Sequence, residues 1–239
     1  MKRGIAIRAM QHGMHASRGF LAMHAGLICL VAVLLFVASG VLLQWVRHDL
    51  DWRLAPMSSY LRGPYGGWLR LAYYGLGLGL VLLGQGLHRT LQPVRSGLPM
   101  RLLATAGIAL VFVAVTELDL PRLTRSQEVA VHQVAALVTF VSVTGAMLLQ
   151  SWRFQDDAAW RPYFRLAFPW AVASFLALGA YASGRGMPAR LELPEGIAQK
   201  IVIGMILLWL GCAAWWLRRA QLALAPVAEE TDDQRGGPR

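Results

Sequence analysis

The chain contains six apolar runs, each long enough to cross a lipid bilayer. A transmembrane helix needs about 20 apolar residues, because each residue advances the helix by about 1.5 Å across a hydrocarbon layer of roughly 30 Å. Water does not reach the backbone there, so each run must satisfy its own hydrogen bonds as a helix. The predicted spans are Phe20–Val46, Trp68–Leu87, Met100–Thr116, Val129–Gln150, Phe164–Ser183 and Ile197–Leu217. The expected fold is therefore an all-α membrane protein, a bundle of six transmembrane helices.

Composition and charge agree with this fold. Charged residues make up 15% of the 239 residues, whereas a soluble domain usually carries about 25%. A formal net charge of +10 would suit a protein that binds nucleic acid, but the arginines flank the apolar runs, which is the ordinary pattern of membrane proteins. We therefore expect the lipid bilayer as the partner of this surface, and no nucleic acid.

The distribution of Lys and Arg predicts the orientation of the bundle. The N-terminus, the second and fourth connections and the C-terminal tail hold fourteen of these residues, and the other three connections hold nine. The short second connection decides the matter, since it has Arg89, Arg95 and Arg101 and no acid. Positive charge favours the cytoplasmic side, so both termini are expected in the cytoplasm. The chain then divides into a cytoplasmic segment (1–19), the transmembrane domain (20–217) and a polar tail (218–239) that is expected to be disordered.

Ionisable side chains gather where the third and fourth spans meet, on the predicted outer side. Glu117 and Asp119 end the third span, and Glu128 and His132 lie at the start of the fourth, four residues apart and so on one helical face. The connection between these spans is short, so we expect the carboxylates and the imidazole to converge. Ionisable groups near membrane depth are costly and often mark functional sites. Asp119 and His132 are the central candidates for a catalytic or binding role, with Glu117, Glu128 and Ser58 around them.

Other interpretations of this region remain open at this level. The acids could form an ion-paired network with Arg122 and Arg125 at headgroup depth, with no further role. Haem is not expected, because no helix carries two histidines within the membrane at the spacing of paired haems. The two cysteines, Cys29 and Cys212, have neither metal-site nor redox spacing, so neither a metal nor a cofactor is expected. Phosphate-loop, zinc-protease and serine-hydrolase signatures are absent from the sequence.

The second span is rich in glycine, and two of its glycines predict close helix packing. Gly75 and Gly79 are four residues apart, the spacing at which small residues let two helix backbones approach. We expect both to face a neighbouring helix.

The arrangement resembles a family of six-helix bacterial and archaeal membrane proteins, domain of unknown function 998, over roughly residues 25–217. Four features carry the resemblance: the stretch Pro56–Tyr60 (PMSSY) after the first span, the acidic end of the third span, His132 early in the fourth, and a sixth span that begins at Gly196 and contains Trp209. Members often have a glycine and a Phe-Pro dipeptide before the acid, where this chain has Val-Thr. A more distant similarity to Frag1/DRAM/Sfk1-type six-helix proteins points toward lipids.

The resemblance implies a multi-pass protein of the bacterial cytoplasmic (inner) membrane, and it assigns no activity. The leading hypothesis for function is a bundle with an outward-facing polar pocket that binds, and modifies or moves, a lipid or amphipathic small molecule. One rival is a non-catalytic membrane subunit or assembly factor, and a second is a small secondary transporter. The two three-helix halves show no evident internal repeat, which argues against transport. The sequence does not decide whether the protein is an enzyme, nor its oligomeric state.

Overall fold

The computed structural model describes residues 2–91, 96–117, 124–184 and 193–233, and this part of the chain is helical without strands. Two short 3-10 helices lie between the long helices, η1 (Met57–Leu61) and η2 (Phe154–Asp156). The long helices are α1 (Lys2–Val46), α2 (Gly66–Thr90), α3 (Leu98–Val115), α4 (Arg125–Arg153), α5 (Arg161–Ser183) and α6 (Glu195–Asp233).

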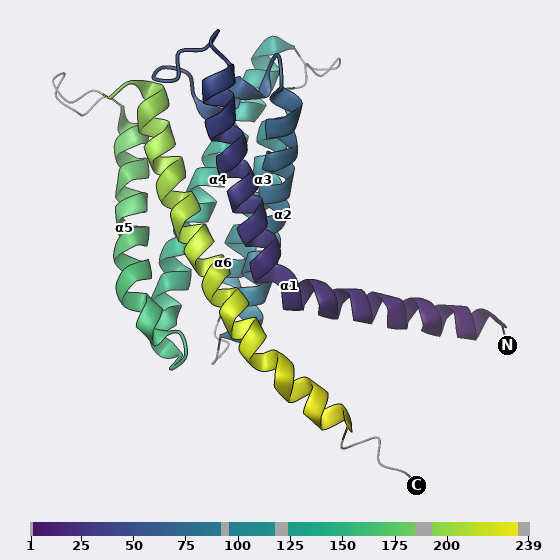
Figure 1. Cartoon of the computed structure of the whole chain (residues 1–239). Coiled ribbons are helices and arrows are strands. Elements are labelled where there is room, and N and C mark those ends of the chain that lie inside the picture. The colour runs from purple at the N-terminus through teal and green to yellow at the C-terminus, as the bar shows by residue number, and fades with distance from the viewer. Residues whose placement is uncertain (1, 92–95, 118–123, 185–192, 234–239) are drawn as a thin grey trace.

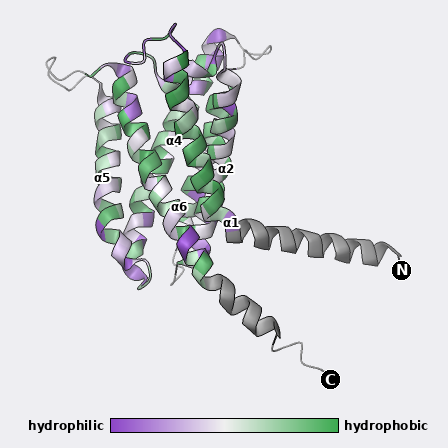
Figure 2. Ribbon diagram, viewed as in Figure 1, coloured by the Kyte–Doolittle hydropathy of each residue, from purple (hydrophilic) through white to green (hydrophobic). Residues whose placement is uncertain are grey.

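All six long helices contain a segment that is long and apolar enough to cross a membrane, which confirms the predicted fold class. Hydrophobic residues dominate the middle of the bundle, and hydrophilic residues gather toward the helix ends (Figure 2). Helices α1 and α6 extend furthest beyond the predicted spans. The membrane-spanning part of α1 is His24–Val46, although the helix itself begins at Lys2.

The C-terminal segment differs from the expectation of disorder. Helix α6 continues to Asp233, and only residues 234–239 lie outside the described part. Alanine, glutamine, leucine and glutamate are frequent after residue 217, and all of them favour helix over other conformations. Local helix propensity thus accounts for the continuation as far as Ala225, whereas Pro226 disfavours the helical turns that follow.

The helices form a closed ring in chain order. Each packs against the next, and α6 packs back against α1 (Figure 1). The start of α1 and the end of α6 lie at the same end of the bundle (Figure 1). The opposite end holds the 47–65 connection, the end of α3 and the beginnings of α4 and α6, and we call it the His132 end.

Helix α2 packs closely through its glycines, although not through both of the predicted ones. A methyl group added to Gly79 would lie 3.3 Å from the Cα of Cys29 on α1, so the prediction for this residue is confirmed. Gly75 was predicted wrongly, because no atom lies within 4 Å of a methyl group at that position. A closer backbone contact than that of Gly79 joins Gly77 to Gly107 of α3, where a methyl group on Gly77 would lie 2.7 Å from the Gly107 carbonyl oxygen. Gly79 thus faces α1 and Gly77 faces α3, so the close contacts come from two sides of α2 and not from the predicted pair four residues apart.

The 47–65 connection folds over the His132 end and is held from two sides. At its start, directly after α1, the Arg47 guanidinium donates to the Arg62 carbonyl oxygen at 2.6 Å and forms two hydrogen bonds with Asp49. From α6, the Lys200 ammonium donates to the carbonyl oxygens of Trp52 (2.6 Å) and Ala55 (2.8 Å). The hydrogen bonds from Arg47 lower the pKa of the Asp49 carboxyl. The connection is therefore an ordered cap on the bundle.

Candidate functional site

Glu117 and His132 form the centre of the polar cluster. The Nδ1 atom of His132 lies 3.0 Å from Oε1 of Glu117 and 3.2 Å from the hydroxyl oxygen of Thr116. Thr116 directly follows α3 as its C-cap residue and hydrogen-bonds back to the carbonyl oxygens of Phe112 and Val113. These bonds fix the point where α3 ends, so Glu117 is directed at the first turns of α4. The predicted proximity of Glu117 and His132 is confirmed.

Arg62 brings a cation to the same carboxylate from a distant part of the chain. Its Nε atom forms an ion pair with Oε2 of Glu117. The backbone of Arg62 is held by Arg47, and the neighbouring Leu61 carbonyl oxygen accepts a hydrogen bond from Arg70 at 2.7 Å. The Glu117 side chain is only 12% exposed, and a carboxylate at such depth requires partners of this kind.

Glu128 lies one turn before His132 on α4. It is 5% exposed and pairs with Arg125 at 3.5 Å, so the expected ion-paired network is present in part. Thr124 begins α4 through a capping box with Gln127, which starts the helix four residues earlier than the predicted span. Asp119, the other central candidate, and Arg122 lie outside the described residues, so the proposed pairing of Asp119 with His132 stays a prediction.

Two neighbouring cavities adjoin these residues and share part of their lining. The first, which we call the inner cavity, has a volume of about 80 Å³ and lies among α1, α2, α3, α4 and α6, with mostly leucine, isoleucine, valine and phenylalanine walls. The second, which we call the vestibule, has a volume of about 470 Å³ and is lined by the ion-paired residues of the cluster together with parts of α5 and the start of α6. Five residues line both cavities: Ser58, His132, Ala136, Phe140 and Gln199.

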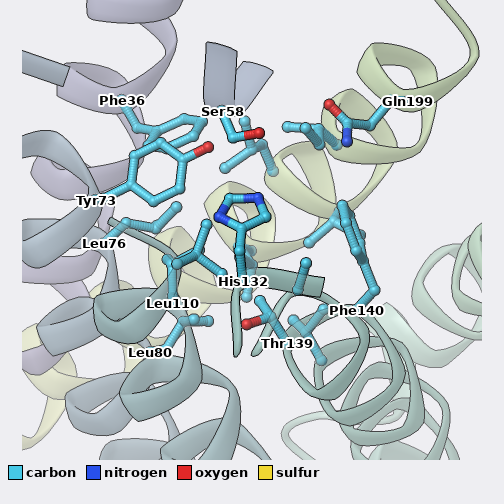
Figure 3. Close-up of a pocket in the computed structure, with 17 residues that line it drawn as sticks. Phe36, Ser58, Tyr73, Leu76, Leu80, Leu110, His132, Thr139, Phe140 and Gln199 are labelled. Atoms are coloured by element: carbon cyan, nitrogen blue, oxygen red, sulfur yellow. The ribbon is translucent and has the colours of Figure 1, made fainter. Parts of the chain in front are cut away.

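These five residues form a throat between an apolar and a polar space. The His132 ring projects into the inner cavity, with the Ser58 hydroxyl group on one side and the Gln199 amide nearby (Figure 3). Gln199 is fixed in orientation, because its Oε1 accepts a hydrogen bond from the Met57 amide at 2.8 Å. Its Nε2 is therefore the end that faces the hydroxyl group of Tyr181, at 3.4 Å.

The arrangement offers acid–base chemistry and hydrogen bonding beside an apolar chamber. Within the described ranges, no group of three or more His, Cys, Asp or Glu could hold a metal ion. Of the sequence candidates, Ser58 and His132 lie at the throat, while Glu117 and Glu128 line the vestibule. Sequence reasoning missed Arg62, Thr116 and Tyr181. Only Arg62 had a usable signal, since it lies two residues after the Pro56–Tyr60 stretch.

The family model described as "Protein of unknown function (DUF998)" matches residues 30–216. The chain belongs to this family. The match spans all six helices and includes every described residue of the polar cluster, so the site lies within the part of the chain that defines DUF998. No curated protein and no solved structure matches the chain. The distant similarity to Frag1/DRAM/Sfk1-type proteins therefore stays a prediction.

Proposed function

We propose that this DUF998 protein binds a lipid or another amphipathic small molecule. The polar part of the ligand occupies the vestibule, and the apolar part extends through the throat into the inner cavity. The observation that carries the proposal is the adjacency of the two spaces: five residues line both, while the walls change from ion-paired side chains to aliphatic ones. A pocket with apolar walls and a few placed polar groups is the usual form of a small-molecule site.

The sizes of the two spaces limit how the ligand is held. The inner cavity, at about 80 Å³, is smaller than a cavity of about 150 Å³ that holds benzene, so in its present form it accepts only the end of a chain. The vestibule is several times larger and takes the headgroup. The vestibule also borders Leu137 of α4, which is 60% exposed, and the exposed Ala182 of α5. A lipid can thus enter sideways between α4 and α5, with its remaining chain in the bilayer.

The proposal places the vestibule on the outer face of a bacterial cytoplasmic membrane. The excess of Lys and Arg in the N-terminus, the second and fourth connections and the tail supports this orientation. The ligand would then come from the outer leaflet or from the outer aqueous side.

Photo-crosslinking tests the binding. The full chain is reconstituted into vesicles of phosphatidylcholine and phosphatidylglycerol that contain a phospholipid with a diazirine at the end of one acyl chain. After irradiation, labelled peptides are mapped by mass spectrometry. We expect adducts on inner-cavity residues such as Leu110 and Ile206, in addition to the adducts that annular lipid leaves on the outer surface.

Matched substitutions on α4 separate a bound lipid from surface lipid. Ala136→Trp fills the throat, whereas Val134→Trp places the same side chain two residues away, at a position where the native valine is 61% exposed. We expect Ala136→Trp to lose the adducts on the inner-cavity residues and Val134→Trp to keep them. Ala136→Leu serves as a smaller filler if the Trp variant does not fold. Adducts confined to the outer surface, or unchanged in a folded Ala136 variant, would refute the proposed site.

A further inference from the structure

Ser58 is presented to the throat as a side chain without a hydrogen-bond partner among the described residues. It lies in the first turn of η1, whose position is set by the hydrogen bond from the Met57 amide to Gln199 and by the contacts of Lys200 with Ala55. Its hydroxyl group lines both cavities, while the adjacent Ser59 lines neither. The fold thus distinguishes two neighbouring serines and holds one of them at the junction of polar and apolar space.

His132 is oriented as a base toward the same space. The Thr116 hydroxyl group gives its own proton to the carbonyl oxygens of α3, and a carboxylate only accepts, so both partners of Nδ1 require a proton on that nitrogen. In the neutral imidazole, Nε2 then carries the lone pair. No residue in the described ranges hydrogen-bonds Nε2, and the ring stands in the cavity with Ser58 beside it (Figure 3).

Glu117 and Gln199 complete the set of groups that acyl transfer needs. Glu117 holds the Nδ1 proton of His132 at 3.0 Å and is itself anchored by Arg62, so it fixes both the tautomer and the ring orientation. Gln199 has its Oε1 bound to the Met57 amide and one Nε2 hydrogen directed at the Tyr181 hydroxyl group, which leaves the second Nε2 hydrogen available at the throat, where it can stabilise a developing oxyanion. A nucleophile, a base, an orienting acid and an oxyanion donor therefore meet at one place.

We infer that Ser58, His132 and Glu117 act as nucleophile, base and positioning residue in acyl transfer from an ester-containing amphipathic ligand. This inference rests on the proposed function, because the bound ligand must place its ester carbonyl at the throat. Ser58 Oγ attacks the carbonyl carbon while its proton moves to His132 Nε2. The C–O ester bond then breaks, and the leaving alkoxide takes the proton from Nε2. Water from the vestibule, deprotonated by the same nitrogen, attacks the carbonyl carbon of the acyl-serine. The bond between this carbon and Ser58 Oγ then breaks, Oγ takes the proton back from Nε2, and a carboxylic acid leaves.

The geometry of the ligand-free site is compatible with this role. Ser58 and His132 line the same cavity without a direct hydrogen bond between them. Catalytic hydrogen bonds are commonly long in ligand-free enzymes and tighten when the substrate binds. The order of the residues along the chain, Ser58, Glu117, His132, is no obstacle, since such sets are defined by geometry and roles.

A serine-directed probe tests the inference on the full chain in detergent micelles. The probe is a fluorophosphonate with a long alkyl chain, and the adduct is located by peptide mass spectrometry. We expect the probe to label Ser58 in the wild-type protein and in Ser59→Ala, and to leave Ser58→Ala unlabelled. His132→Gln should lower the labelling rate by about a hundredfold or more, the usual contribution of a general base. Glu117→Gln should lower the rate and change its pH profile, with partial rescue by Glu117→Asp, which a merely structural role would not produce.

The outcomes separate this inference from the proposed function. If the diazirine lipid still labels the inner cavity but folded protein forms no adduct at Ser58, the acyl-transfer inference is overturned and binding stands. If the fluorophosphonate labels Ser59 equally, or labels Ser58→Ala protein to the same extent, the assignment of the nucleophile is wrong. If the wild-type chain forms no lipid adducts in the inner cavity, both the proposed binding and the acyl-transfer inference are overturned.

Discussion

The contact between Gly77 and Gly107 makes a quantitative prediction about stability. A methyl group on Gly77 would lie 2.7 Å from the Gly107 carbonyl oxygen, whereas ordinary contacts begin near 3.4 Å. Helices α2 and α3 must therefore separate locally by about 0.7 Å, the difference of these two distances, or leave their preferred packing. Overpacking of this kind costs roughly 1–3 kcal/mol. Gly75 lies on the same helix with no atom near its added methyl group, so Gly75→Ala gains up to about 1 kcal/mol from helix propensity.

The same gain in helix propensity applies to Gly77→Ala, so the overpacking remains as the difference, and we expect Gly77→Ala to be less stable than Gly75→Ala by about 1–3 kcal/mol. At about 2–4 °C per kcal/mol for a chain of this size, the difference in Tm is roughly 2–12 °C. The assay is thermal unfolding of both variants in the same detergent, followed by the fluorescence of the nine tryptophans. Gly107→Ala should behave like Gly77→Ala. The double variant should lose less stability than the two single variants together, because one separation of the helices accommodates both methyl groups. Equal Tm values for Gly75→Ala and Gly77→Ala would refute this account of the packing.

Two further predictions concern the cap and the orientation. Hydrogen bonds from Arg47 lower the pKa of the Asp49 carboxyl in the folded state. This pair therefore stabilises the fold at pH values above the ordinary pKa of an aspartate, about 3.9. Its contribution is lost as the pH falls through the lowered pKa. The Tm of the wild type should therefore fall more between pH 5 and pH 3 than the Tm of Asp49→Asn, and parallel curves would contradict the assignment. A reporter enzyme that works only outside the cytoplasm should be active when fused after Thr124 and inactive after Ser96, and the reverse pattern would invert the proposed orientation.

The six spans could be predicted from the sequence because the requirement that the hydrocarbon core places on a span concerns only the residues of that span. A span must be a continuous apolar run, and such runs can be found without knowing what packs against them. The side of a helix that faces its neighbour is a global property. Gly75 and Gly77 differ by two positions, and only the packed bundle decides which of them meets α3. The early start of α4 was recoverable, since Thr124 and Gln127 form a recognisable capping box.

The contacts of the candidate site also include some that the sequence predicts and others that only the folded bundle shows. Glu117 and His132 were predicted to meet because a short connection joins their helices, and they do. Arg62 reaches Glu117 from an independent connection, and Gln199 reaches the throat from the last helix. Contacts between segments so far apart in the chain leave no local pattern, so only the folded arrangement brings them into view.

The docking of the 47–65 connection has a consequence for how the protein is made. Lys200 and Gln199 of α6 hold backbone groups of this connection that were synthesised more than 140 residues earlier. The first span and its cap must therefore wait in the membrane, without these partners, until the sixth span has left the ribosome. A nascent chain that ends before α6 has Ser58, His132 and Glu117 but lacks the α6 side chains that hold the 47–65 connection in place. The acyl transfer that we infer for the throat would therefore require the last helix to be inserted.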